Sequence, residues 1–288
     1  MNFRKSALAP GLYLVATPIG NARDITLRAL DVLASADVLV AEDTRTLLKL
    51  LQIHGIPTEG RRVQAFHDHS KERDRARLME AIAEGRSVAY TTDAGTPLIA
   101  DPGYTLVNAA REAGHMVTGA PGPSAVIAAL TLAGLPTDAF AFLGFAPNQQ
   151  TARREFYAGL ATAEMTSVFY EAPSRIQASI ADARESLGPD REAVVCREIT
   201  KRFEEVERGP LGDLAARIAA KAPKGEYVVV VARADKQIVD EAEIDARINE
   251  ALTTMRVKDA ADAVAGALGL PRREIYQRAL RLKSEQKP

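Results

Sequence analysis

Residues 88–97 read Val88-Ala89-Tyr90-Thr91-Thr92-Asp93-Ala94-Gly95-Thr96-Pro97. The apolar run at the start of this stretch is bounded by small and turn-forming residues, which indicates a buried strand that ends in a loop. In an open α/β sheet, ligands bind outside the carboxyl ends of the strands. Asp93 places a carboxylate in this loop, and the small residues after it allow a ligand to approach the backbone. An ordinary strand-to-helix turn is the simpler interpretation of these residues alone.

A helix is predicted after this loop, over residues 102–112. Asp101 is a favourable N-cap, and proline, here Pro102, is favoured at the first helical position. Gly114 stands where a glycine commonly ends a helix. The stretch therefore encodes a strand, a small-residue loop and a helix, in this order.

The same order recurs on both sides of this stretch. The predicted strands cover residues 12–16, 38–41, 63–66, 88–90 and 117–120. The predicted helices cover residues 25–36, 46–53, a charged segment up to 84, 102–112 and 125–133. Ser124 is a suitable N-cap for the last of these helices, and Gly134 ends it. About five β-α repeats favour right-handed crossovers and a largely parallel sheet.

Beyond Gly134 the pattern changes. Predicted strands at 140–145, 167–170, 193–197, 204–208 and 226–232 are separated by only about three helices. Two neighbouring strands lack a helix between them, so this part is expected to form a mixed sheet. We therefore expect two α/β domains, at residues 1–118 and 119–236, with a linker near 119–136.

A helical tail is expected at residues 237–288, after a polar linker over 235–241. Apolar residues recur at helical spacing over 243–254, 258–268 and 272–283. The break at Gly269-Leu270-Pro271 resembles the short turn of helix-turn-helix units. The predicted fold class is thus α/β, with a parallel sheet, then a mixed sheet, and a small C-terminal helical domain.

Composition limits the possible functions. The chain has 288 residues, 47% of them apolar, and a formal net charge of -1, so a polyanionic partner would need a local basic surface. Cys196 is the only cysteine, which excludes an internal disulfide and the common zinc clusters. No apolar run approaches the roughly 20 residues of a spanning helix, and the first ten residues do not resemble a signal peptide. A soluble, cytoplasmic protein without membrane contact is expected.

Two segments carry ionisable side chains at predicted strand ends. Glu42-Asp43-Thr44-Arg45 has three such residues in four positions, and a solvated loop and a site are about equally good interpretations. His67-Asp68-His69 is too small a pattern to indicate a metal site without a third ligand, so no metal is expected. The chain contains neither a P-loop, nor a Rossmann glycine fingerprint, nor a serine hydrolase elbow.

Six motifs appear together in a characteristic order. They are Thr17-Pro18-Ile19-Gly20-Asn21, Glu42-Asp43-Thr44-Arg45, Thr92-Asp93-Ala94-Gly95-Thr96-Pro97, Asp101-Pro102-Gly103, Pro121-Gly122-Pro123-Ser124-Ala125 and Arg197-Glu198-Ile199-Thr200-Lys201. Over residues 11–233 the chain resembles the tetrapyrrole methylase superfamily, and within it the branch that methylates small-subunit ribosomal RNA. The resemblance implies 2′-O-methylation of a cytidine in 16S rRNA with S-adenosylmethionine as cofactor. It also implies a cofactor cleft between two α/β domains, and a homodimer.

The resemblance also suggests which residues carry the chemistry. It places the cofactor against Asp93, Ala94, Gly95, Ser124, Ala125, Tyr170, Glu171, Gly225 and Glu226. The 2′-hydroxyl must lose a proton, and we expect Glu42 or Asp43 to accept it while Arg45 holds a phosphate. Arg175 and Lys201 follow strand ends and are candidates for the RNA backbone, with structural ion pairs as the alternative role.

The end of the tail is locally basic, with six Lys and Arg against two Glu in the last twenty residues. The expected RNA-docking residues there are Arg272, Arg273, Arg278 and Arg281. Basic helix ends are also common for dipole reasons alone.

Two other functions stay open on the sequence. One is a small-molecule tetrapyrrole methylase, which keeps fold and cofactor but needs no basic arm. The other is an RNA-binding assembly factor that has lost catalysis. The small-residue loops around Asp93 and Ser124 favour retained cofactor binding over this last possibility.

Overall fold

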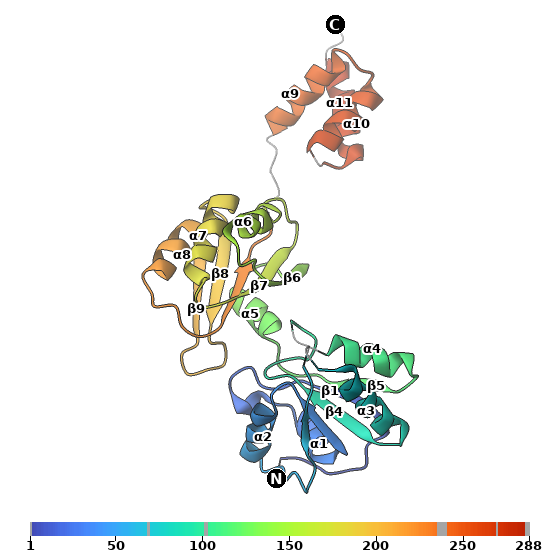
Figure 1. The fold of residues 1–288 in the computed structure, drawn as a ribbon. Helices are drawn as coiled ribbons and strands as arrows, with labels where there is room; N and C mark the ends of the chain where they lie inside the picture. The colour runs from blue at the N-terminus through green and yellow to red at the C-terminus, as the bar shows by residue number, and fades with distance from the viewer. Residues whose placement is uncertain (1, 68–69, 101–102, 235–240, 269, 286–288) are drawn as a thin grey trace. The chain divides into compact units, whose positions relative to one another are not determined.

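The computed structural model describes residues 2–67, 70–100, 103–234, 241–268 and 270–285. The chain divides into two compact units, residues 1–234 and 235–288. The first unit contains two sheets, each with its own helices (Figure 1). Among the described residues, no helix is long and apolar enough to cross a membrane.

The first sheet is parallel throughout. Its strands are β1 (Gly11–Val15), β2 (Val38–Ala41), β3 (Val63–Ala65), β4 (Ser87–Thr91) and β5 (Val117–Ala120). They lie in the order β3-β2-β4-β1-β5, and every pair is parallel, as predicted. All carboxyl ends therefore meet at one edge, which gathers the predicted loops.

Helices cover both faces of this sheet. They are α1 (Leu27–Ser35), α2 (Thr44–Ile53), α3 (Glu72–Ala83) and α4 (Tyr104–Glu112), with a 3₁₀ turn at Ala22–Asp24. Ala89 packs in the cluster that contains Leu33 of α1 and Leu51 of α2. The neighbouring residues Val88 and Tyr90 pack with α3 and α4 instead. Because side chains alternate along a strand, the two helix pairs lie on opposite faces. We call this sheet with its four helices the first lobe.

One predicted helix start is wrong. Helix α4 begins at Tyr104 with Gly103 as its N-cap, whereas Pro102 was expected to begin it; Asp101 and Pro102 lie outside the described residues. Gly103 has φ +123°, and a Cβ there would lie 2.8 Å from the buried Tyr90 ring. Only glycine fits at the N-cap of α4, because the Tyr90 ring leaves no room for a side chain there. At the other end, Gly114 (φ +72°) follows the helix as predicted.

The second sheet is mixed, as predicted. Its strands are β6 (Phe140–Phe145), β7 (Thr166–Glu171), β8 (Glu192–Arg197), β9 (Glu205–Pro210) and β10 (Tyr227–Val231). Their order is β6-β7-β10-β8-β9, in which only β6 and β7 run parallel. Strands β8 and β9 follow one another without a helix, which makes them an antiparallel pair.

This sheet is also covered on both faces. Helices α6 (Gln150–Ala158), α7 (Ile176–Leu187) and α8 (Leu211–Ala219) pack on one face, around Phe169 and Val229. Helix α5 (Ala125–Ala133) packs on the other, against Val168 and Val194. Helix α5 begins after Ser124 and ends at Gly134, as predicted. We call this sheet with helices α5–α8 the second lobe.

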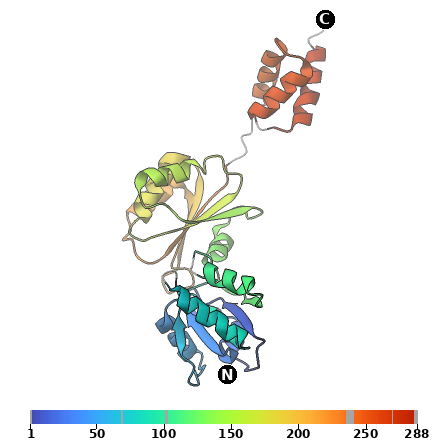
Figure 2. The same cartoon turned by 45° about the vertical axis from the view of Figure 1, so that its right-hand side comes forward.

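The tail forms three helices that lie side by side in both views (Figures 1 and 2). They are α9 (Glu241–Leu252), α10 (Val257–Leu268) and α11 (Arg272–Glu285), which confirms the three predicted segments. Their shared core includes Ile248, Val264 and Ile275, each contributed by a different helix. Residues 235–240 of the predicted linker and Gly269 of the predicted break lie outside the described residues, and Glu241, the last residue of the predicted linker, already begins α9.

Candidate functional site

A cavity of about 360 Å³ lies between the two lobes of the first unit. Its wall from the first lobe and the start of α5 includes Ile19, Ala94, Gly95, Thr96, Ser124 and Ala125. Its wall from the second lobe includes Phe145, Tyr170, Glu171, Pro173, Ile199 and Glu226. We call it the first cavity. It collects loops that are up to about 200 residues apart in the sequence.

The first-lobe wall is held by backbone contacts. Thr17 and Gly95 exchange two hydrogen bonds, with N–O distances of 2.9 and 3.0 Å. The Thr96 hydroxyl donates to the carbonyl of Pro123 at 2.9 Å, which fixes the loop before α5. Gly95 has φ +85°, and a Cβ there would lie 3.4 Å from Ile19. The left-handed backbone favours glycine here, whereas a Cβ alone would only touch Ile19 at an ordinary van der Waals distance.

The second-lobe wall contains a buried carboxylate. Glu171 is 2% exposed, and its Oε1 accepts hydrogen bonds from the Ala172 N–H at 2.8 Å and Arg175 Nε at 2.9 Å. Its Oε2 is buried without a partner among the described residues. A buried carboxylate oxygen without a donor is costly, so this atom is suited to a ligand that brings one.

Glu226 of the second-lobe wall belongs to an ion-pair network. Lys201 Nζ lies 2.8 Å from Glu198 Oε1 and 2.9 Å from Glu226 Oε2. The Glu226 N–H donates to the same Glu198 oxygen at 3.0 Å. The hydrogen bond from Lys201 holds the pKa of Glu198 below its usual value. Gly225 (φ +86°) leaves room for this network, since a Cβ there would lie 2.6 Å from Glu198 Cδ.

The loops of the two lobes interlock beside the cavity. The Asn21 N–H donates to the Thr200 hydroxyl at 3.1 Å. A Cβ on Gly20 would lie 2.5 Å from Lys201 Cγ and 2.6 Å from the Thr200 hydroxyl. Glu198 (φ +51°) and Thr200 (φ +64°) hold left-handed conformations that are uncommon for residues other than glycine. Ile19 and Ile199, one from each loop, both line the cavity.

The structure brings together seven of the nine residues expected around the cofactor. Asp93 and Gly225 do not line the first cavity. Asp93 lines a neighbouring cavity, and its Oδ1 accepts from the Asp43 N–H at 3.1 Å. Gly225 acts behind the wall by making room for Glu198. Sequence reasoning missed the apolar lining residues Ile19, Ile99, Phe145, Pro173, Ile199 and Val228.

The acidic loop at the end of β2 is tied to its own arginine. Asp43 is the N-cap of α2 and forms a two-pronged ion pair with Arg45, with Nη2–Oδ2 at 2.5 Å and Nε–Oδ1 at 3.0 Å. Hydrogen bonds from the Arg45 side chain and backbone lower the pKa of Asp43 to about 2. A carboxylate with this pKa is a weak proton acceptor, so Asp43 is poorly suited to act as a general base.

Two families match the chain, one in each compact unit. The family described as Tetrapyrrole (Corrin/Porphyrin) Methylases matches residues 11–215. The chain belongs to the tetrapyrrole methylase family. The family described as RsmI C-terminal HTH domain matches residues 239–283, which cover the three tail helices.

Curated relatives of this family member span nearly its whole length. Ribosomal RNA small subunit methyltransferase I of Mesorhizobium japonicum is 44% identical over 277 residues, which cover 96% of this chain and 93% of the relative. The protein of the same name from Vibrio cholerae is 46% identical and covers 81% of this chain and 82% of its own. These relatives identify the chain as a methyltransferase.

Solved structures support the fold of the tetrapyrrole methylase. Uroporphyrin-III-C-methyltransferase from Thermus thermophilus has a TM-score of 0.54 at 22% identity, covering 78% of this chain and 94% of its own. The methyltransferase CobJ has a TM-score of 0.59 at 21% identity, covering 80% and 95%. At these identities the likeness concerns the fold alone.

Most of the residues expected to contact RNA form ion pairs within this tetrapyrrole methylase. Arg175 binds buried Glu171, and Lys201 binds Glu198 and Glu226, so both support the first cavity. In the tail, Arg272 pairs with Asp262 of α10, and Arg278 pairs with Asp245 of α9.

Two basic tail residues differ in their contacts from these pairs. Arg281 lies 4.0 Å from Glu285 on the same helix, and Arg273 makes no ion pair with the described residues. The whole tail, residues 235–288, has ten Lys and Arg against ten Asp and Glu. The tail as a whole therefore carries no excess of positive charge, and the excess is confined to its last twenty residues.

Metal ligands do not gather in the described part of the chain: no three His, Cys, Asp or Glu side chains come together there. Of the His67-Asp68-His69 segment, Asp68 and His69 lie outside the described residues.

Proposed function

We propose that this protein transfers a methyl group from S-adenosylmethionine to the ribose 2′-hydroxyl of a cytidine in 16S rRNA. The observation that carries the proposal is similarity over nearly the full chain, tail included, to relatives named ribosomal RNA small subunit methyltransferase I. The first cavity gives such a reaction a place, because loops of both lobes enclose it.

The residues of the first cavity fit S-adenosylmethionine. Glu171 Oε2 is a buried acceptor without a donor in the described part of the chain, which suits a hydroxyl or ammonium group of the cofactor. Gly95 and Ala94 expose backbone to the cavity, while Ile19, Ile199 and Val228 provide apolar surface for a flat ring. These side chains and backbone groups would hold the cofactor.

When bound, the cofactor supplies a methyl group already activated by a sulfonium. The protein then has to align acceptor and donor and exclude water, which the walls of the first cavity serve. It also has to receive the proton of a weakly acidic hydroxyl. Glu42 stands at the end of β2, beside the Asp43–Asp93 hydrogen bond, and is the acceptor that we propose.

The proposed partners are 16S rRNA or the assembled small subunit, and a second copy of the chain. Strand β6 is an edge strand of the second sheet, and it exposes Phe140 and Leu143 outside the lining of the first cavity. A row of exposed apolar residues on an edge strand is a suitable surface for a homodimer.

The decisive experiment is mass mapping of ribose methylation on 16S rRNA from cells with and without this protein. A 2′-O-methyl cytidine that is present only with the protein supports the proposal. Methylation of a porphyrinogen instead would identify a small-molecule methylase. If calorimetry detects no S-adenosylmethionine binding, the protein is an assembly factor without catalysis.

A substitution in the first cavity tests where the cofactor binds. Gly95→Val should weaken S-adenosylmethionine binding about 10-fold or more, because the branched side chain would crowd Ile19 and strain a backbone at φ +85°. Calorimetry measures the affinity. Gly85→Val is the matched control, since Gly85 has φ +89° but open space around its Cβ position. Equal affinities in the two variants would place the cofactor elsewhere.

Removal of the tail tests RNA docking. Deleting residues 235–288 should leave cofactor binding unchanged, because residues 1–234 form their own compact unit. RNA binding should weaken, and its dependence on salt should flatten by about 0.7–0.9 in log–log slope for each lost phosphate contact. Filter binding at several salt concentrations measures both.

A second variant separates docking from packing in the tail. Arg273→Ala with Lys283→Ala removes two exposed cations that form no ion pair with described residues, so the helices should stay folded. An unchanged affinity and salt slope in this variant and in the truncated protein would assign the tail to packing or dimerisation.

A further inference from the structure

A second cavity, of about 190 Å³, opens at the carboxyl edge of the first sheet. It lies between the loop after β1, the end of β4 and helix α2. Strands β1 and β4 are neighbours, yet α1 follows β1 on one face and α4 follows β4 on the other. This is the topological switch point of the sheet, where ligands of open α/β sheets characteristically bind.

The lining of the second cavity combines polar and apolar residues. Its polar groups come from Thr17, Thr46, Lys49, Thr92 and Asp93. Its apolar surface comes from Pro18, Leu47, Leu50 and Ile53. Thr92 is only 3% exposed. Its hydroxyl is buried and has no hydrogen-bond partner among the described residues. This lining suits a flat heterocycle, which has apolar faces and a polar edge.

The two cavities are direct neighbours. Asp93 lines the second cavity and Ala94, the next residue, lines the first. Their Cα atoms are about 3.8 Å apart, as across any trans peptide. Thr17 and Gly95, which exchange two backbone hydrogen bonds, divide the cavities in the same way. The two cavities therefore share a boundary at residues 93 and 94.

We infer that the second cavity receives the base of the target nucleotide, taken out of the RNA stack. This inference rests on the proposed function. Enzymes that modify a nucleotide within a helix commonly extrude it into a pocket that reads its edge. With the base beside α2, the ribose lies at the rim shared by Asp93 and Ala94, next to the first cavity. Thr92 and Asp93 then face the polar edge of the base.

A filling substitution tests this assignment. Thr46 is exposed on α2 and lines the second cavity, so Thr46→Tyr should block it without disturbing the core. Leu48→Tyr is the matched control, because Leu48 is an exposed residue of the same helix outside the lining. Single-turnover methylation of 16S rRNA should fall about tenfold or more in Thr46→Tyr only, which corresponds to one decade in rate. Both variants should bind S-adenosylmethionine as the unchanged protein does.

Direct binding separates this inference from the proposed function. Cytidine is titrated into the isotope-labelled protein, and amide shifts are followed by NMR. Shifts at residues 46–53 and 91–93 that disappear in Thr46→Tyr support the second cavity as the base site. Shifts confined to other residues, or equal methylation rates in Thr46→Tyr and Leu48→Tyr, overturn it. If the protein binds cytidine there but leaves 16S rRNA unmethylated, the proposed function fails and the base site stands.

Discussion

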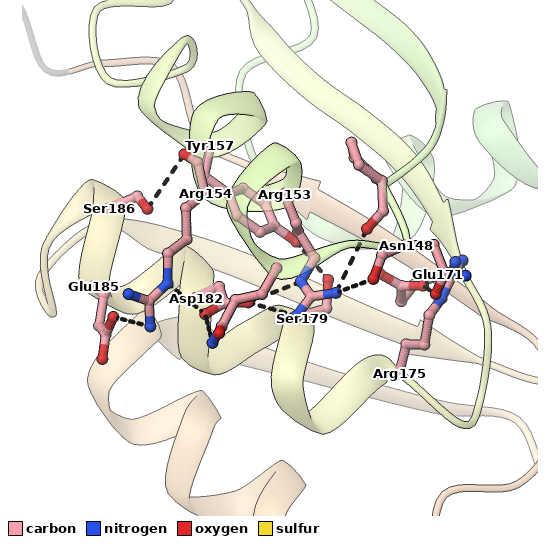
Figure 3. A network of polar contacts seen from close by, with 12 residues as sticks. Asn148, Arg153, Arg154, Tyr157, Glu171, Arg175, Ser179, Asp182, Glu185 and Ser186 are labelled. Atoms are coloured by element: carbon pink, nitrogen blue, oxygen red, sulfur yellow. Dashed lines mark hydrogen bonds and ion pairs between the residues drawn. The ribbon is translucent and has the colours of Figure 1, made fainter.

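Asp182→Ala is expected to destabilise the second lobe by about 3–5 kcal/mol, because it leaves a buried guanidinium without its counter-ion. Arg153 Nη2 lies 2.6 Å from Asp182 Oδ2, and the side chains are only 5% and 3% exposed. Arg153 of α6 sits between Asp182 of α7 and the loop after β6, where it donates to the Asn148 carbonyl at 3.0 Å (Figure 3). Urea denaturation followed by circular dichroism measures the change.

Glu185→Ala is the control for this prediction. Glu185 pairs with Arg154 on the same two helices but is 60% exposed, and exposed pairs contribute about 0–1 kcal/mol. A loss of similar size in both variants would mean that the Arg153–Asp182 pair does not determine stability. The Arg153→Met, Asp182→Leu double variant should recover much of the loss, since no unpaired charge stays buried.

The same pair gives stability a pH dependence. Burial alone would raise the pKa of Asp182, but hydrogen bonds from Arg154, Arg153 and Gln150 lower it overall. A carboxyl whose pKa is lowered by folding stabilises the folded state at pH values above its pKa in the unfolded chain, which is near 3.9. This contribution is lost as the pH falls through the pKa of the folded state. Stability should therefore fall in acid more steeply for the unchanged protein than for the Arg153→Met, Asp182→Leu variant.

Glu42→Gln is expected to lower the methylation rate by about 10²–10⁴-fold, the usual effect of removing a general base. Cofactor affinity should hardly change, because Glu42 does not line the first cavity. Single-turnover rates at saturating S-adenosylmethionine measure the chemistry, and calorimetry measures the affinity.

Asp43→Asn is the comparison for Glu42→Gln. Asp43 has a pKa of about 2 beside Arg45, so it is ionised throughout the neutral range and accepts protons poorly. Its loss should reduce the rate less, through the N-cap of α2 and the position of Arg45. Near-unchanged turnover in both variants would mean that solvent takes the proton. A larger effect in Asp43→Asn would reverse the assignment.

Much of the fold follows from local sequence patterns. Strand β2 is an apolar run that ends directly in a polar motif, and the structure reproduces its predicted bounds. Helix α5 lies between Ser124 and Gly134, and both residues take the expected positions. The start of α4 was not predictable locally, because it depends on the Tyr90 ring, which reaches Gly103 only in the folded protein.

The candidate site was predictable where small residues follow strands. Ala94, Gly95, Ser124 and Ala125 line the first cavity because parallel strands end at a common edge. Ile19 and Ile199 also line it, but in the sequence an aliphatic residue there is indistinguishable from core. The ion pairs between residues that are distant in the sequence could not be predicted either.

These ion pairs could not be predicted because their partners lie far apart along the chain. Arg278 binds Asp245 across 33 residues, so its role as a contact between helices is visible only once α9 and α11 are packed.

The interlock of Asn21 with Thr200 has a thermodynamic consequence. Because each lobe supplies one wall of the first cavity, a ligand bound there cross-links the lobes without a covalent bond. At a hundred times its dissociation constant, such a ligand adds about 2.7 kcal/mol to the stability of the folded state. The two lobes should then open as one cooperative unit. Amide hydrogen exchange should therefore slow together in β4 and β10, two strands of separate sheets.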